Sequence, residues 1–250
     1  AYAAAGVTAV AMEFVPRITR AQSMDVLSSQ ANLAGYRAII EGSQLYGRAL
    51  PMMMTAAGTV AAAKGFVMGA GVAGLQAIAT ARRLGGVVSA TDVRPASKEQ
   101  VASLGAKFIA VEDEEFKAAE TAAGYAKPMS AEYQKKQAEL VASHIVKQDI
   151  VVTTALIPGR PAPVLVTEAM VKSMRPGSVV VDLAVTQGGN CTLSKPDQVI
   201  DVNGVKVIGF TNLPGRIAAD ASALYARNLL ALLPLLTGEN AAFAPKWDDE

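Results

Sequence analysis

Residues 66–74 read Phe-Val-Met-Gly-Ala-Gly-Val-Ala-Gly, and they decide the fold. The three apolar residues before Gly69 predict a short strand, and the apolar periodicity from Val72 to Leu84 predicts a helix. Between them stands the pattern G-x-G-x-x-G, in which each glycine has a mechanical role. Gly69 permits the tight turn, Gly71 lets the backbone approach a bound group, and Gly74 lets the helix pack closely on the sheet. The sequence therefore predicts a strand–turn–helix unit.

The next strand supplies a carboxylate opposite this turn. Val87–Thr91 reads as a strand that leads into Asp92, about twenty residues after the glycines, which is the spacing of a dinucleotide-binding unit. The N–H groups of the turn and the positive end of the helix dipole would hold a pyrophosphate. Asp92 would accept hydrogen bonds from the adenosine ribose hydroxyls. A 2′-phosphate would meet a like charge there, so the sequence favours NAD over NADP.

Arg94, two residues beyond Asp92, leaves several interpretations open. A nearby arginine can accommodate a 2′-phosphate, which would reverse the preference. Arg94 is equally well explained as a solvated loop charge or as a stacking surface for adenine. We give Asp92 more weight because it sits at the strand tip.

Strand and helix patterns alternate from Phe66 to Ile208, which predicts a parallel sheet with helices on both faces. Asn203-Gly204 between two apolar runs predicts a tight hairpin. The predicted fold class is α/β, a Rossmann-like doubly wound parallel sheet. The predicted strands are Phe66–Met68, Val87–Thr91, Lys107–Val111, Asp149–Thr154, Ser178–Ala184, Val199–Val202 and Val205–Gly209; the predicted helices are Val72–Leu84, Ala96–Leu104, Ala131–Val146 and Thr167–Met174; and residues 112–130 are predicted to form a mobile excursion.

A second group of small and polar residues falls at the same edge of the predicted sheet. Thr153–Gly159 follows a strand, and its small residues would let a cofactor come close to the backbone. Asp182 and Asn190 follow the next strand. Gly188-Gly189-Asn190 predicts a turn that needs positive φ, and its spacing alone assigns it no chemistry.

The two ends of the chain fall outside this alternation. Val7–Val15 reads as a buried strand that ends at Pro16, and a long helix is expected over 24–50, with Ser23 as a candidate N-cap. A last helix is expected over 219–236. We interpret these parts as the remnant of a second α/β lobe joined by long helices. The predicted domains are 1–51, the end of the first lobe and the linking helix; 52–216, the nucleotide-binding domain; and 217–250, a return helix and C-terminal segment.

Composition excludes several classes of function. The 250 residues carry 23 Lys and Arg against 22 Asp and Glu, which gives no electrostatic reason to expect a nucleic acid partner. One cysteine and one histidine, Cys191 and His144, exclude a cysteine-based or multi-histidine metal site, so no metal is expected. No apolar stretch reaches the ~20 residues of a membrane-spanning helix, and we expect a soluble segment of a longer polypeptide. The sequence offers no obvious acid–base pair beside the nucleotide site, and hydride transfer between two nicotinamides needs none.

Pro16–Arg37, which reads PRITRAQSMDVLSSQANLAGYR, resembles a signature of proton-translocating NAD(P) transhydrogenases, in their NAD(H)-binding alpha component. The segments GAGVAGLQ at 69–76, TTALIPG at 153–159, Asp182–Asn190 and TNLPGR at 211–216 are also similar to that family. Alanine dehydrogenase is the neighbouring relative and shares the fold, but the loop at 20–25 fits it less well.

The resemblance implies that NAD(H) binds in a cleft between two lobes and exchanges hydride with NADP(H) held on a separate domain. It also implies coupling to proton movement through a membrane domain, a homodimer, and a place on the cytoplasmic face of the bacterial inner membrane or on the mitochondrial matrix side. It assigns Arg17, Gln22, Asp25 and Ser28 to the loop that orients the nicotinamide; Gly69, Gly71, Val72, Ala73 and Gly74 to the pyrophosphate; Asp92, Val93 and Arg94 to the adenosine; Gly124 and Tyr125 to a mobile loop over the cofactor; and Thr154, Ala155 and Leu156 to the nicotinamide side.

Two alternatives stay open at this point. The first is an NAD-dependent amino-acid dehydrogenase of the alanine type, which would need a substrate-binding lysine and histidine from outside the present sequence. The second is a non-catalytic NAD-sensing module.

Overall fold

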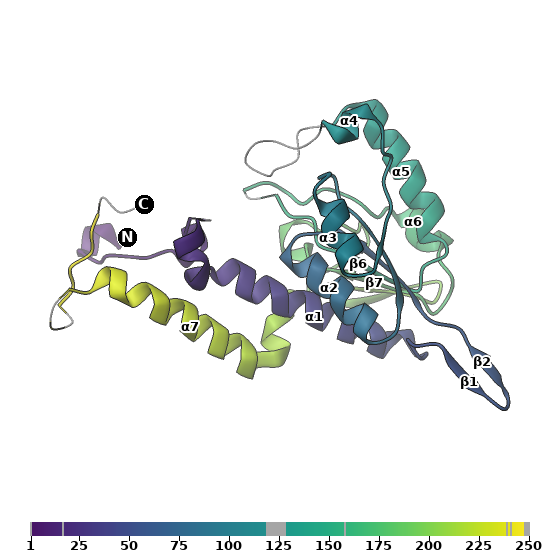
Figure 1. The fold of residues 1–250 in the computed structure, drawn as a ribbon, viewed down its shortest axis with the longest axis horizontal. Coiled ribbons are helices and arrows are strands. Elements are labelled where there is room, and N and C mark those ends of the chain that lie inside the picture. Colours follow the sequence, from purple (N-terminus) through teal and green to yellow (C-terminus); the bar gives the residue numbers. More distant parts are fainter. Residues whose placement is uncertain are drawn as a thin grey trace. The chain divides into compact units, whose positions relative to one another are not determined.

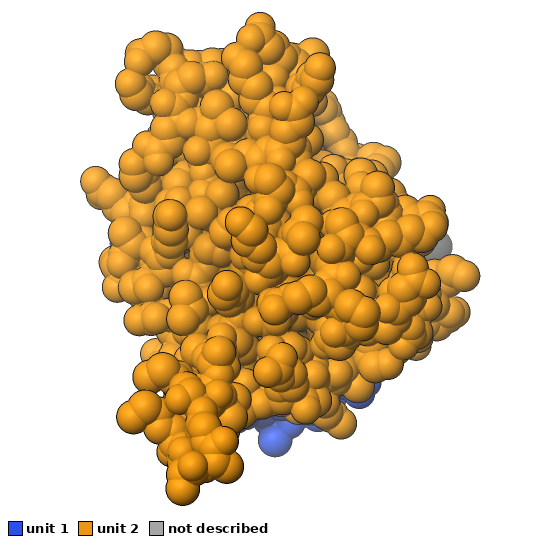
Figure 2. Space-filling view, turned by 90° about the vertical axis from the view of Figure 1, so that its right-hand side faces the viewer, with its two compact units in different colours: residues 1–33, 214–250 blue, residues 34–213 orange. Residues whose placement is uncertain are grey.

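The structure is a computed structural model and describes residues 2–16, 18–118, 129–157, 159–238, 240 and 242–247. The chain divides into two compact units, which Figure 2 distinguishes by colour. One comprises residues 1–33 with 214–250, and the other comprises residues 34–213. The domain boundaries expected after residues 51 and 216 stay a prediction.

The larger unit contains a seven-stranded sheet in the order β5-β4-β3-β6-β7-β9-β8. Every neighbouring pair is parallel except β8 with β9, the hairpin predicted at Asn203-Gly204. This order corresponds to the doubly wound nucleotide-binding arrangement, with one antiparallel edge strand added. The predicted Rossmann-like α/β fold is thereby confirmed. The strands are β3 Lys64–Met68, β4 Val87–Thr91, β5 Lys107–Phe108, β6 Ile150–Thr153, β7 Val179–Asp182, β8 Val199–Val202 and β9 Val205–Ile208.

Helices cover both faces of this sheet, because the central strands are apolar on both sides. Val67 packs in one core with residues of α1 Val26–Tyr46, α2 Val72–Arg83 and α3 Ser97–Ser103. Phe66, its neighbour on the same strand, packs in the opposite core with residues of α5 and α6. Strands β6 and β7 alternate in the same way between the two cores. The helices of the second face are α5 Ala131–Ile145 and α6 Glu168–Ser173, and the short elements η4 Val185–Gln187 and α4 Glu114–Lys117 complete this unit.

A two-stranded hairpin, absent from the predicted elements, lies between α1 and β3. Strands β1 Met53–Thr55 and β2 Gly58–Val60 pair antiparallel and form a sheet of their own (Figure 1). Its strand residues are exposed except the half-buried Val60, and Met54 is 78% exposed. Isolated two-stranded ribbons are marginally stable in water.

The smaller unit is helical. It contains η1 Ala3–Ala5, η2 Met12–Phe14, η3 Thr19–Met24, the first part of α1, η5 Pro214–Ile217 and α7 Ala218–Leu236. Asn228 of α7 donates from Nδ2 to the Ser23 carbonyl at 2.7 Å and accepts from Ser29 Oγ at 2.8 Å. These two bonds tie the C-terminal helix to the segment that leads into α1.

The prediction of a buried strand over Val7–Val15 is wrong. The segment is irregular and then forms η2, and of these residues only Met12 is buried. Val7 and Phe14 are 51% and 81% exposed. A strand needs a neighbour that completes its backbone hydrogen bonds, and no described strand lies beside this segment.

The cap of α1 also differs from expectation. Ser23 lies inside η3, and Asp25 immediately precedes α1. The Asp25 carboxylate accepts the Ser28 N–H at 2.9 Å and the Ser28 hydroxyl at 2.5 Å. Asp25 is therefore the N-cap of α1, and its negative charge also suits the positive end of the helix.

Gly74→Ala is expected to lower the free energy of unfolding by about 1–3 kcal/mol, because the new β-carbon would collide with the Gly69 carbonyl oxygen. Gly71→Ala is the matched control, since a β-carbon at Gly71 would have no neighbour within 4 Å. Urea denaturation of both variants measures the difference. Equal stabilities for the two variants would contradict the packing described for this turn.

Candidate functional site

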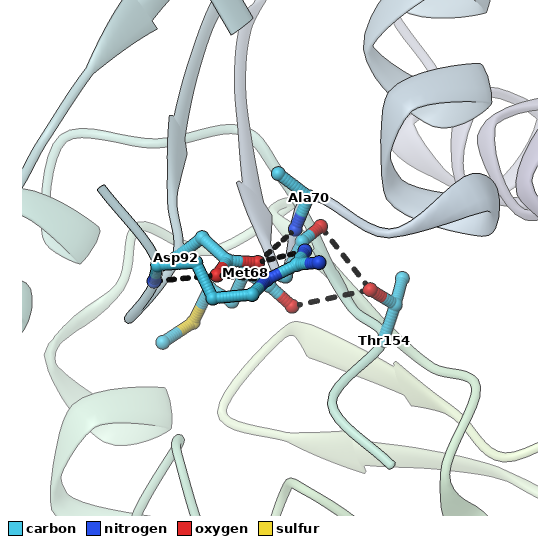
Figure 3. Close-up of polar contacts among 6 residues, drawn as sticks. Met68, Ala70, Asp92 and Thr154 are labelled. Atoms are coloured by element: carbon cyan, nitrogen blue, oxygen red, sulfur yellow. Dashed lines mark hydrogen bonds and ion pairs between the residues drawn. The ribbon is translucent and has the colours of Figure 1, made fainter. Parts of the chain in front are cut away.

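The turn after β3 is packed closely against β4, against Thr154 and against the start of α2. Gly69 has φ of 110°, and its N–H donates to the Thr91 carbonyl on β4 at 2.8 Å. A side chain at Gly69 would meet the Thr154 hydroxyl, and one at Gly74 would meet the Gly69 carbonyl. Figure 3 shows Thr154 and Asp92 beside this turn. Glycine is therefore required at both positions for steric reasons.

Gly71 is the open point of the turn. It is exposed, and it is the N-cap residue of α2 with extended backbone. No side chain caps the first N–H groups of α2, which begins with Val72 and Ala73. The first N–H groups of a helix have no intrahelical partner, and the helix dipole makes this end positive. Gly71, Val72 and Ala73 can thus hold an anion such as a pyrophosphate.

Asp92 lies beside the turn, at the carboxyl end of β4. One carboxylate oxygen accepts the Ala70 N–H at 2.7 Å and Arg94 Nη2 at 3.0 Å. The other accepts the Arg94 N–H and Arg94 Nε, both at 2.9 Å. Four donors match the four lone-pair sites of a carboxylate. The Asp92 side chain is only 7% exposed, whereas that of Arg94 is 31% exposed.

These contacts keep Asp92 ionised. Burial acts to raise the pKa of the Asp92 carboxyl, but the hydrogen bonds from Arg94 and from the Ala70 N–H outweigh it and hold the pKa below its ordinary value. The structure gives Arg94 a role beyond the interpretations that the sequence left open. Arg94 is the counter-ion of Asp92. Val93 between them is 46% exposed.

In the segment after β6, the first two residues form hydrogen bonds within the protein and the next two are exposed. The Thr154 hydroxyl donates to the Gly69 carbonyl at 3.2 Å, so it faces the glycine turn. Ala155 forms hydrogen bonds through its N–H and its carbonyl with the side chain of Asn190. Leu156 is 48% exposed, and Ile157 is 43% exposed. The loop thus presents apolar side chains at the carboxyl edge of the sheet.

Two buried or half-buried amides at this edge have a role that the sequence did not indicate. Gln137 of α5 donates to the Thr91 hydroxyl at 3.0 Å and accepts the Val111 N–H at 2.9 Å. Asn190 is fully buried and holds Ala155. Both pairings cross 26 or more residues of sequence, so no local pattern could have indicated them. The positive φ predicted at Gly188 and Gly189 is confirmed.

The smaller unit contains a pocket of about 360 Å³, lined by Pro16, Ile18, Gln22, Asp25 and Ser28. The structure thus brings together three of the four residues assigned to orientation of the nicotinamide. Arg17, the fourth, lies outside the described residues, as do Gly124 and Tyr125.

The single histidine lies away from the glycine turn. His144 of α5 shares a hydrogen bond of 2.8 Å with Ser89, in the middle of β4, and packs edge-on against Phe66. Burial lowers the pKa of His144, and the nearby Lys107 adds to the effect. Burial likewise raises the pKa of the Cys191 thiol. Neither side chain is placed or charged for acid–base work at the turn.

The described residues carry neither a metal-binding cluster nor a membrane-spanning helix. They contain no group of three or more His, Cys, Asp or Glu side chains that could hold a metal ion. None of their helices combines the length and the apolar character that crossing a bilayer would require.

Comparison with known sequences identifies the family. The domain described as "Alanine dehydrogenase/PNT, C-terminal domain" matches residues 38–250, and the corresponding N-terminal domain matches residues 1–34. The chain belongs to the alanine dehydrogenase/PNT family. The resemblance found from the sequence motifs is therefore confirmed.

Within this family, the transhydrogenase branch is strongly similar. The chain is 62% identical over 245 residues to an NAD(P) transhydrogenase subunit alpha polypeptide of Rhodospirillum rubrum, covering 98% of this chain and 64% of that polypeptide. The crystal structure of transhydrogenase from Sinorhizobium meliloti matches with a TM-score of 0.88 and 65% identity, over 98% of this chain and 65% of that one. The chain therefore spans slightly less than two thirds of these relatives.

The alanine dehydrogenase branch is more distant. A structure of L-alanine dehydrogenase matches with a TM-score of 0.70 and 24% identity, over 91% of this chain and 58% of that one. At this identity the likeness shows the shared fold alone.

Arg94→Ala is expected to lower the free energy of unfolding by about 1–2 kcal/mol at pH 7, because a buried carboxylate loses its counter-ion. The folded-state pKa of Asp92 lies below the unfolded value of about 3.9, so this contribution is complete above that pH and is lost as the pH falls through the folded pKa. Urea denaturation between pH 7 and pH 3 should therefore show the gap to the unsubstituted protein closing below about pH 4.

Lys206→Ala is the control for this experiment. Its partner Asp201 is 55% exposed, and exposed ion pairs contribute little to stability. A gap for Arg94→Ala that stays constant down to pH 3, or one no larger than the control, would contradict the role given to Arg94.

Proposed function

We propose that this chain is the NAD(H)-binding component of a proton-translocating transhydrogenase, in which hydride passes between NAD(H) on this chain and NADP(H) on a separate domain. One observation carries the proposal: 98% of the chain aligns at 62% identity with a subunit named for NAD(P) transhydrogenase. The geometry of the glycine turn supports the cofactor half of it independently.

The residues present fit a dinucleotide. Gly71 leaves backbone exposed where a pyrophosphate would approach, and the uncapped start of α2 offers N–H groups at Val72 and Ala73. Asp92 offers a carboxylate to the adenosine ribose. All four of its acceptor sites are in use, so ribose hydroxyls would replace hydrogen bonds from the Arg94 side chain. The Arg94 side chain would then pack against the adenine.

The order of the strands supports an orientation for the cofactor. The chain reverses its winding between β3 and β6, and ligands of such sheets bind at that point. With the adenosine over β4 and the pyrophosphate over β3, the nicotinamide extends over β6. Thr154, Ala155 and Leu156 follow β6, which supports their predicted place on the nicotinamide side.

When bound, the nicotinamide supplies a carbon that donates or accepts hydride. The task of the protein residues is then to bind, orient and exclude water rather than to move protons. The absence of a histidine near the turn, among the described residues, suits that task. Gln22, Asp25 and Ser28 line one pocket and are proposed, with Arg17, to orient the nicotinamide. Gly124 and Tyr125 are proposed to fold over the bound cofactor.

The partners proposed are an NADP(H)-binding domain, a membrane domain and a second copy of this chain. The exposed and uncharged β1–β2 hairpin supports the homodimer, because its Met53 and Met54 face solvent on an edge able to pair with another strand. The proposed location is the cytoplasmic face of the bacterial inner membrane, or the matrix side in a mitochondrion.

Assays with nicotinamide substrates test the function directly. The full-length protein, mixed with an NADP(H)-loaded partner domain, is expected to transfer hydride between NADH and an NADP analogue. Pyruvate and ammonia are expected not to support NADH oxidation. Pyruvate- and ammonia-dependent turnover would establish the alanine dehydrogenase alternative instead, and NADH binding without transfer of either kind would establish a sensing module.

Asp92→Asn is expected to weaken NADH binding about tenfold or more, since charged acceptors make the stronger hydrogen bonds to hydroxyl groups. It is also expected to narrow the preference for NADH over NADPH, because the charge that repels a 2′-phosphate is gone. Calorimetric titration with both cofactors measures the two effects. Asp201→Asn, at an exposed position of β8, should change neither. Unchanged affinities for Asp92→Asn would refute the ribose role.

A further inference from the structure

Asn190 joins two loops through a completely used side chain. It is 0% exposed. Its Oδ1 accepts the Ala155 N–H at 3.0 Å, and its Nδ2 donates to the Ala155 carbonyl at 2.9 Å and to the Pro163 carbonyl at 2.8 Å. The backbone of Ala155 thus pairs with the side-chain amide as it would with a neighbouring strand: its N–H donates one hydrogen bond and its carbonyl accepts another. The pairing spans 35 residues of sequence.

The chemistry of these three bonds admits asparagine and little else. One acceptor faces an N–H group, and two donors face carbonyl oxygens, so the amide has a single satisfactory orientation. An aspartate of the same shape would place a charged oxygen against two carbonyl oxygens. An alanine would leave the N–H and carbonyl of Ala155 and the carbonyl of Pro163, all half-buried, without these hydrogen bonds.

The segment that carries Asn190 is itself bound to Asp182, the last residue of β7. The fully buried Asp182 carboxylate accepts the Cys191 N–H at 3.0 Å and the Ser194 hydroxyl at 2.6 Å. It also accepts the Ala184 N–H at 2.9 Å. The Asn190 carbonyl in turn accepts the N–H groups of Leu165 and Val166. The amide is therefore mounted on a rigid support and not on a free loop.

The loop that Asn190 holds is the one that follows β6. Thr154 contacts the glycine turn, Ala155 is fixed by Asn190, and Leu156 and Ile157 then project with nearly half their surface exposed. This loop lies across β3 from Asp92, on the side where the nicotinamide is proposed to extend.

We propose that Asn190 is a positioning residue for hydride transfer: it sets the height and direction of the loop at 155–157, against which the nicotinamide ring rests. This inference rests on the proposed function. Asn190 reaches the ring only through the loop, so it should affect the geometry of transfer much more than the binding of the dinucleotide, whose pyrophosphate and adenosine contacts lie elsewhere.

Asn190→Ala, in the full-length protein with its NADP(H)-loaded partner, is expected to slow single-turnover hydride transfer about 10–100-fold, since a misplacement near 1 Å can cost that much. The dissociation constant for NADH should change less than about threefold, because the phosphate and ribose contacts are untouched. Stopped-flow absorbance measures the first quantity, and calorimetry measures the second.

Gln148→Ala is the matched control. Gln148 is also a buried amide, with 4% exposure, but it contacts His144 just before β6 starts, at the opposite edge of the sheet. It should lower stability without slowing hydride transfer. Equal effects of the two variants on transfer, or parallel losses of NADH affinity and transfer rate in Asn190→Ala, would show a merely structural role and overturn the proposal.

Asn190→Asp covers the case in which the alanine variant does not fold, because it leaves no cavity. At neutral pH it is expected to slow hydride transfer at least as much as Asn190→Ala does. The rate is expected to recover in part at lower pH, where the carboxyl is protonated and can donate one hydrogen bond. A transfer rate equal to that of the unsubstituted protein would overturn the proposal. If the unsubstituted protein itself neither binds NADH nor transfers hydride, the proposed function fails, which is a different result from normal transfer by both variants.

Discussion

The approach of backbone to backbone around Gly69 is the constraint on which the rest depends. The Gly69 carbonyl lies where a β-carbon at Gly74 would stand, and the Thr154 hydroxyl lies where a β-carbon at Gly69 would stand. Helix α1 makes a similar approach, since a β-carbon at Gly35 would meet the Ala73 carbonyl. The glycine turn and the first turn of α2 are thus packed against Thr154 and α1 so closely that no side chain fits at Gly69, Gly74 or Gly35. Gly71 is the position left open, and an open backbone at a positive helix end is what an anionic group requires.

Much of this could be predicted from the sequence, because the information is local. The apolar strands, the glycine spacing and the Asn203-Gly204 turn each depend on a few adjacent residues. Val7–Val15 shows the limit of such patterns. Its apolar run has β-propensity, but a strand exists only beside another strand, and the described residues provide none.

The polar side chains show the same limit more sharply. Ser23 was the expected cap by residue type, but α1 starts at Val26, and this start makes Asp25 the cap instead. Arg94 could be seen as a nearby cation, but its pairing with Asp92 depends on the bend after β4. The sequence placed Asn190 near this edge but not its contacts, because its partners Ala155 and Pro163 are set by the pairing of β6 with β7 and not by neighbours in sequence.

The polar groups at the carboxyl edge of the sheet share one property, which bears on the kind of chemistry this site can support. Asp92, Asp182 and Asn190 all use their acceptors on N–H or O–H groups of the protein, and Asn190 and Thr154 donate to backbone carbonyls. The histidine pairs instead with Ser89 and Gln148, so these groups are not arranged to deliver a proton through it. An enzyme that oxidises an alcohol or amine must remove a proton from it, whereas exchange of hydride between two nicotinamide rings removes none. A carboxyl edge whose polar groups hold the backbone in place and transfer no proton therefore suits the proposed transfer of hydride between two nicotinamide cofactors. The demands of the proposed reaction fall on distance and angle, and the role proposed for the buried amide of Asn190 is to set both.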